Sequence, residues 1–231
     1  MVSAMKRISL IFSFVALFAF GGNAQMRDFR FGLKVGPSAD WANAGSVQTE
    51  NKGVGIGLNA GLVVDYCLTS HFAASSGVNV NLMQMRYRFG DFRRVGDFLE
   101  ETDVDVVRRL KATNLEVPIK AKFSFDLADV RAYVEAGGCL GFNFTDYGKD
   151  SFNLFGVDYE TEGDYSTQYR AFQPSLVFGL GAEYEVARKL NLFVQLTFNH
   201  ALLNAFVGSL EQQTGSILRN NFVGLEVGFM H

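Results

Sequence analysis

The stretch Val54-Gly55-Ile56-Gly57-Leu58-Asn59-Ala60-Gly61-Leu62-Val63-Val64-Asp65-Tyr66 alternates between two kinds of side chain. Every second residue from Val54 to Tyr66 is apolar, and most of the residues between them are Gly, Asn or Asp. Successive side chains of a β-strand point to opposite faces, so the pattern predicts a strand with one apolar and one polar face. It is longer than most strands of soluble proteins.

The same alternation recurs along most of the chain. The sequence contains 14% aromatic residues, 24 Gly and only 3 Pro, a balance that favours strands and tight turns. We therefore predict an all-β fold of about eight strands, the number typical of a small closed barrel. The other strands are expected at 29–36, 72–82, 115–125, 130–142, 169–186, 190–203 and 218–231, with a local distortion at Pro118.

The predicted connections alternate in length. Short ones are expected at 68–70, 126–129 and 187–189, and long ones at 44–52, 90–111, 146–168 and 206–216. Short periplasmic turns and long outer loops are typical of outer-membrane barrels.

The apolar strand faces carry essentially no charge, which decides between two all-β architectures. A lipid-facing exterior around a polar interior has this pattern, whereas a lipocalin has an apolar cavity. Backbone groups in lipid must pair within the protein, so the sheet has to close. We predict a closed antiparallel transmembrane β-barrel; the alternative is a soluble all-β envelope protein whose aromatic residues form an ordinary core.

The N-terminus has the features of a secretory signal peptide, residues 1–24. Lys6 and Arg7 precede an apolar run, and Gly22-Asn23-Ala24 provides a small-residue cleavage site before Gln25. The apolar run of roughly 13 residues is shorter than the roughly 20 that a spanning helix needs. The first cysteine is Cys67, so acylation next to the cleavage site is not expected. The barrel is expected to be a single domain, residues 25–231.

The inward-facing charges are nearly balanced in sign. A barrel of about eight strands is filled by side chains or holds one small ligand, so we expect paired charges that close the lumen. A narrow or gated polar conduit is the alternative. Cys67 and Cys139 are expected as free, lumen-facing thiols. The inward charges are Arg30, Lys34, Lys120, Lys122, Arg131, Asp65, Glu116, Glu135, Glu183, Glu185 and Glu226.

The sequence indicates no catalytic, cofactor-binding or metal-binding residues. His71, His200 and His231 lack the spacing of metal ligands. Asn199-His200, with Ser209 or Ser216, could suggest a hydrolase, but no nucleophile motif accompanies them. A net charge of -3 without a basic stripe argues against nucleic-acid binding.

Several motifs resemble those of PorT-like outer-membrane β-barrels of Bacteroidetes. Asn114-Leu115-Glu116-Val117-Pro118-Ile119-Lys120-Ala121-Lys122 is similar to the family's Leu-Glu-Ile-Pro-rich strand, and Tyr133-Val134-Glu135-Ala136-Gly137 to its next strand. Further matches are Gly179 to Tyr184 and Leu190 to Asn204, whereas Met230-His231 departs from the usual terminal aromatic. The resemblance implies an outer-membrane location, and some members are linked to protein secretion and gliding.

The sequence favours a structural or surface-interaction protein over an enzyme. Assistance to protein secretion is the second hypothesis and a lipid-active enzyme the third. The expected partners are outer-membrane lipid and, through the loops, envelope or secretion proteins. The charged regions 91–111 and 146–164 are expected either as solvated loops or as contacts for a partner or a divalent ion. The pattern does not fix an oligomeric state.

Overall fold

The computed structural model describes residues 29–44, 49–93, 102–188, 190–206 and 218–231. The predicted signal peptide lies outside these residues, and its cleavage before Gln25 remains a prediction for N-terminal sequencing to check. The described residues form nine strands and a single turn of 3-10 helix, η1 (Ser166–Gln168). The strands are β1 (Phe29–Ala44), β2 (Thr49–Cys67), β3 (Phe72–Arg93), β4 (Thr102–Leu127), β5 (Val130–Leu154), β6 (Val157–Asp164), β7 (Phe172–Ala187), β8 (Leu190–Ala201) and β9 (Leu218–Met230).

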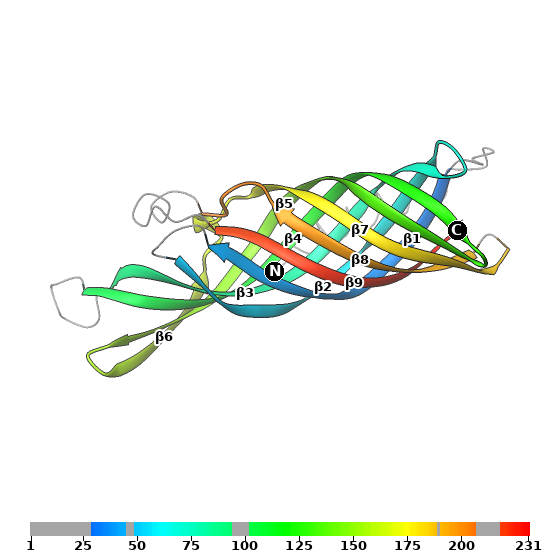
Figure 1. The fold of residues 1–231 in the computed structure, drawn as a ribbon. Coiled ribbons are helices and arrows are strands. Elements are labelled where there is room, and N and C mark those ends of the chain that lie inside the picture. Colours follow the sequence, from blue (N-terminus) through cyan, green and yellow to red (C-terminus); the bar gives the residue numbers. More distant parts are fainter. Residues whose placement is uncertain (1–28, 45–48, 94–101, 189, 207–217) are drawn as a thin grey trace, which may run out of the picture.

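Eight of these strands close into a ring. The hydrogen-bonded order runs β4-β3-β2-β1-β9-β8-β7-β5, and β4 also pairs with β5, which completes the barrel. All of these pairs are antiparallel, and β6 pairs only with the outer part of β5. Figure 1 shows the tilted strands of the barrel and the β6 hairpin extending from one end. The predicted all-β closed barrel is confirmed.

The strands separate apolar from polar side chains in the predicted way. Exposed apolar side chains cover the barrel wall, and we call them the apolar belt. Among the described residues, no helix is long and apolar enough to span a membrane. Representative belt residues are Phe31, Leu33, Leu58, Val80, Leu82, Ile119, Phe123, Val134, Phe142, Phe144, Leu180, Leu196, Leu225 and Val227.

The two ends of the barrel differ, as predicted. At one end the strands join through short turns between Cys67 and Phe72 and between Leu127 and Val130. At the other end β3, β4 and β5 continue well past the belt, and their extensions project beyond the other strands (Figure 1).

Two regions that we expected to be loops are largely strand. Residues 102–111 belong to β4, and residues 146–164 form the end of β5 and β6. The alternation persists there, but its polarity inverts: Val106 and Leu110 point inward, and Arg109 points outward. Beyond the bilayer the outer face meets water, so the apolar side chains lie inside. We expected loops in these two regions because both are rich in charged residues.

Pro118 coincides with a break in the sheet. The β3–β4 register passes from Ser76↔Ile119 to Asn79↔Glu116 without pairing the residues between them. Ser76 Oγ donates instead to the Pro118 carbonyl oxygen at 2.8 Å. The predicted local distortion is therefore present.

Candidate functional site

The barrel lumen contains a network of buried ion pairs. Lys34 Nζ lies 2.9 Å from Glu226, and Lys122 Nζ lies 2.8 Å from Asp65. Lys122 and Arg30 both contact Glu183 at 2.5 Å. Lys120 pairs with Glu135. Four cations are thus each matched to a carboxylate, as the inward charge balance predicted.

Neutral side chains join these ion pairs into one network. Gln195 Nε2 donates to Glu135 at 2.6 Å and to Thr197 Oγ1 at 2.8 Å, and Thr197 in turn donates to Glu226 at 2.9 Å. Tyr133 donates its hydroxyl to Gln195 Oε1 at 2.9 Å, while the Lys122 ammonium lies 4.0 Å from the centre of its ring. The lumen is therefore crossed by interacting side chains from seven strands, β1, β2, β4, β5, β7, β8 and β9.

Glycines opposite the largest lumen side chains make this filling possible. A Cβ on Gly181 would lie 2.4 Å from the Tyr133 ring, and a Cβ on Gly179 would lie 2.4 Å from the side chain of Glu135. Both glycines belong to β7, next to the strand that carries Tyr133 and Glu135. Their missing side chains provide the space into which those two groups fold.

Glu116 is a lumen carboxylate that forms no ion pair with any described residue. The amide of Asn199 donates to it at 3.3 Å. It lines a cavity of about 10 Å³ together with Asn79 and the paired residues Lys34 and Lys120. A single water needs roughly 10–15 Å³, so this space is too small for a hydrated ion.

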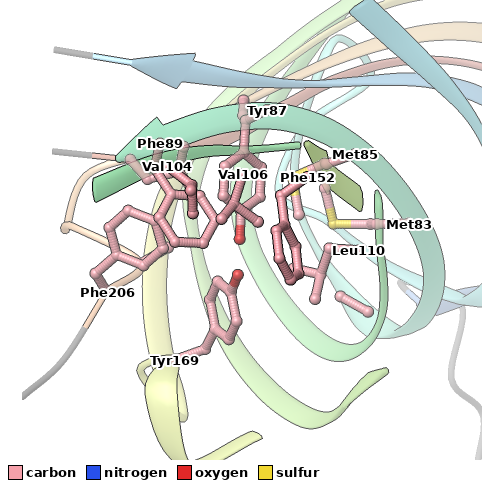
Figure 2. Close-up of a cluster of buried hydrophobic side chains, with 14 of the residues drawn as sticks. Met83, Met85, Tyr87, Phe89, Val104, Val106, Leu110, Phe152, Tyr169 and Phe206 are labelled. Carbon is pink, nitrogen blue, oxygen red and sulfur yellow. The ribbon is translucent and has the colours of Figure 1, made fainter. Parts of the chain in front are cut away.

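A second core lies above the belt, where the strand extensions and connecting segments meet over the barrel mouth. Figure 2 shows its side chains directed toward one another from several elements. We call this cluster the outer cap. It contains Ala42, Met83, Met85, Tyr87, Phe89, Val104, Val106, Leu110, Ala112, Phe152, Leu154, Tyr169, Ala205, Phe206, Leu218 and Phe222.

Arg108 is buried in the outer cap. Its guanidinium donates to both carboxylate oxygens of Asp150, at 2.6 and 2.9 Å, and to Gln168 at 2.8 Å. The Tyr165 ring covers it at 3.7 Å. Bidentate pairing and aromatic stacking are the contacts for which arginine is best suited, so Arg108 joins β4, β5 and the segment around η1.

Asp146 is a buried acid just above the belt. It is 2% exposed and accepts a hydrogen bond from the Asn143 amide. Burial raises its pKa to about 6, with a smaller contribution from the charge of Asp164. The protonation of this group therefore changes in the mildly acidic range.

Some individual expectations were wrong. Arg131 pairs with Asp126 at the short-turn rim, and Glu185 is exposed at the same end, so neither contributes to the lumen network. Cys67 and Cys139 are free thiols as expected, and Cys139 is buried. Sequence reasoning missed Gln195 as a lumen group and missed Arg108. For Arg108, the inward alternation along 104–112 was the available signal.

Asn199 and His200 do not form a common site. Asn199 points into the lumen toward Glu116, whereas the His200 ring stacks near Phe198, with 6.4 Å between ring centres. Adjacent strand residues face opposite sides, which explains the separation. Ser209 and Ser216 lie outside the described residues. The described residues thus offer no positive evidence for catalysis.

A closed ring of eight strands with an apolar exterior and a polar, filled interior defines an outer-membrane β-barrel. The model of the family described as "Outer membrane protein beta-barrel domain" matches residues 23–207. The chain belongs to this family, and its location is the outer membrane.

Comparison with known proteins gives remote similarities. No curated protein matches the chain. Among solved structures, Neisserial surface protein A shares 13% identity with a TM-score of 0.41, covering 86% of this chain and 95% of that one. OprG from Pseudomonas aeruginosa shares 13% identity with a TM-score of 0.37, covering 88% and 95%. The outer-membrane protease OmpT from Escherichia coli shares 9% identity with a TM-score of 0.41, covering 90% and 97%.

Proposed function

We propose that the protein is a non-enzymatic, non-conducting barrel that presents the β5–β6 hairpin at the cell surface as a contact element. The observation that carries the proposal is the tip of this hairpin. Phe155 and Gly156 join the paired residues Leu154 and Val157, and both turn residues have positive φ, 51° and 85°. Phe155 is 81% exposed.

A two-residue turn of this type strongly prefers Asn-Gly, because Asn and Gly tolerate positive φ. A phenylalanine in this conformation costs on the order of 1–3 kcal/mol. An exposed aromatic ring kept at such a cost is suited to anchor a partner surface, where aromatic residues often dominate the binding energy.

The substitution Phe155→Asn separates contact from folding. It removes the ring and leaves the turn with its preferred sequence, so the barrel should fold at least as well as the wild type. Under this proposal, deletion of the gene should weaken the envelope, and a strain carrying only Phe155→Asn should show the same defect despite normal protein levels. Leu154→Asn, which damages the outer cap, serves as the structural comparison. Normal envelope integrity in the strain carrying Phe155→Asn would contradict a contact role for the ring.

The closed lumen is tested separately. Because ion pairs fill the interior and the outer cap covers its mouth, purified protein in planar bilayers should give no steady conductance. A large, stable wild-type conductance would show a water-filled channel and would replace the contact proposal with a transport function.

Assistance to protein secretion is the second candidate. The resemblance of Asn114–Lys122 to a strand of PorT-like barrels of Bacteroidetes supports it. Under this hypothesis, the deletion strain accumulates secreted proteins in the periplasm while its envelope stays intact. Quantifying exported proteins in both fractions distinguishes the two roles.

A further inference from the structure

We propose that the outer face of β3, β4 and β5 binds the phosphate groups of an anionic lipid in the outer leaflet. Three cations on this face, Arg86, Arg109 and Lys111, form no ion pair with any described residue. Their side chains point away from the outer cap, since the alternating residues Tyr87, Arg108 and Leu110 point into it.

The strand register brings like charges side by side. Arg86 is the direct cross-strand partner of Arg109, and Arg109 is the direct partner of Lys149 on β5. Directly opposed like charges destabilise a sheet. Lys149 is compensated by Glu160 at 2.7 Å, whereas Arg86 and Arg109 are not compensated within the described residues. An external anion would remove this repulsion.

Neighbouring carboxylates on this face are already engaged by other cations. Glu50 and Asp105 both contact Arg88, at 2.7 and 3.2 Å, and Glu160 and Glu162 contact Lys149. The cations nearest the belt, Lys111 and then Arg109, therefore have no carboxylate partner among the described residues. They form a cationic row at the upper edge of the belt.

The height of this row fits a lipid headgroup. Leu82, the last exposed apolar residue of β3, pairs with Thr113, and the next outward pair along the strands is Gln84 with Lys111. Each such step rises about 5 Å for a strand tilted by roughly 40°. Lys111 and Arg109 thus lie about 5 and 10 Å above the belt, near the headgroup layer, which extends roughly 5–8 Å from the hydrocarbon core.

The side-chain chemistry also favours phosphate. Two arginines can each bind phosphate oxygens with two parallel N–H donors, and lysine adds a point charge. Tyr147, the cross-strand partner of Lys111, is exposed at the same height, where tyrosine is common at membrane interfaces.

The test measures lipid binding to the full-length purified protein by native mass spectrometry. The probes are diphosphoryl lipid A, monophosphoryl lipid A, phosphatidylcholine and inorganic phosphate. The test variant is Arg86→Gln/Arg109→Gln/Lys111→Gln. The control, Arg88→Gln/Arg131→Gln/Arg188→Gln, removes the same charge at paired or short-turn positions. Heat-modifiable migration on gels confirms that each barrel is folded.

Wild type and control should bind diphosphoryl lipid A more tightly than phosphatidylcholine, with the monophosphoryl form intermediate. At roughly fivefold per cation near a membrane surface, the test variant should lose about 100-fold in affinity. In zwitterionic detergent alone it should be at least as heat-stable as the wild type, because like-charge repulsion is removed, but lipid A should stabilise it less.

Three results would overturn the proposal. Equal binding by the test variant and the wild type would show that the row does not hold the lipid. An equal loss in the control would show a general charge effect. Complete displacement of lipid A by millimolar inorganic phosphate would identify a site for the free anion rather than for a lipid headgroup.

Discussion

Replacing Glu135 by Gln tests whether the lumen is a dry, ion-paired core. The pair Lys120–Glu135 is buried, with side chains 5% and 2% exposed. Glu135→Gln keeps the shape of the side chain and can still accept the hydrogen bond from Gln195. It leaves the Lys120 ammonium without its counter-charge. Breaking a buried pair from one side costs about 3–5 kcal/mol, because the remaining charge stays desolvated.

The double variant Lys120→Met/Glu135→Gln isolates the charge effect. It removes the uncompensated ammonium while keeping side-chain volume similar, so most of the lost stability should return; replacing buried ion pairs by apolar groups is often nearly neutral. A further control, Val134→Ala, alters the neighbouring residue of β5, which faces lipid. The free energy of unfolding can be followed in urea with lipid vesicles, using the fluorescence of Trp41, the chain's single tryptophan.

A cost below about 1 kcal/mol for Glu135→Gln would refute the reasoning, since water must then reach Lys120 and solvate it. The lumen would be hydrated in solution, and a conducting role would need to be reconsidered. A double variant as unstable as the single one would instead assign the loss to packing around Gly179.

Three other predictions follow from the same structure. Leu196→Arg or Val134→Arg, on the lipid face near the middle of the belt, should cost roughly 2–4 kcal/mol of folding stability in lipid. Leu58→Arg, nearer the outer edge, should cost less, and Gln84→Arg, above the belt, should be nearly neutral. Equal effects at all four sites would contradict the assigned facing. Gly181→Ala should cost about 1–3 kcal/mol of unfolding free energy because its methyl group meets Tyr133, while Gly138→Ala, with its nearest neighbour at 3.9 Å, should cost less. Because burial raises the pKa of Asp146 to about 6, folding favours its protonated form, so its contribution to stability is complete below about pH 4 and is lost as the pH rises through 6. Asp146→Asn should flatten the pH dependence of the unfolding midpoint in this window, and an unchanged profile would show that Asp146 is hydrated.

The sequence predicted the barrel but not its outer cap. In a lipid-facing strand every second residue must be apolar, so β2 could be identified directly from its own residues. The individual ion pairs of the lumen were harder to predict, because the alternation shows which charged residues face inward but not how high each one lies along the barrel axis. Lys120 and Glu135 were both expected in the lumen and do pair there, whereas Arg131 was placed in the lumen although it lies at the short-turn rim and pairs with Asp126. Pairing depends on strand stagger, which only the closed barrel defines.

Strand β4 passes from the lipid bilayer into water, and the polarity of its two faces changes where it does so. Along β4, Ile119 faces lipid while Lys120 lies in the lumen; farther out, Arg109 faces the outside while Arg108 and Leu110 lie in the outer cap. The side-chain parity is the same throughout, and only the polarity of each face changes with its surroundings. Such a strand cannot slide along the membrane normal without burying Lys111 in lipid or exposing Ile119 to water. The position of the polarity change therefore fixes the depth of the barrel, and it sets both the cationic row and the Phe155 tip at defined heights above the bilayer.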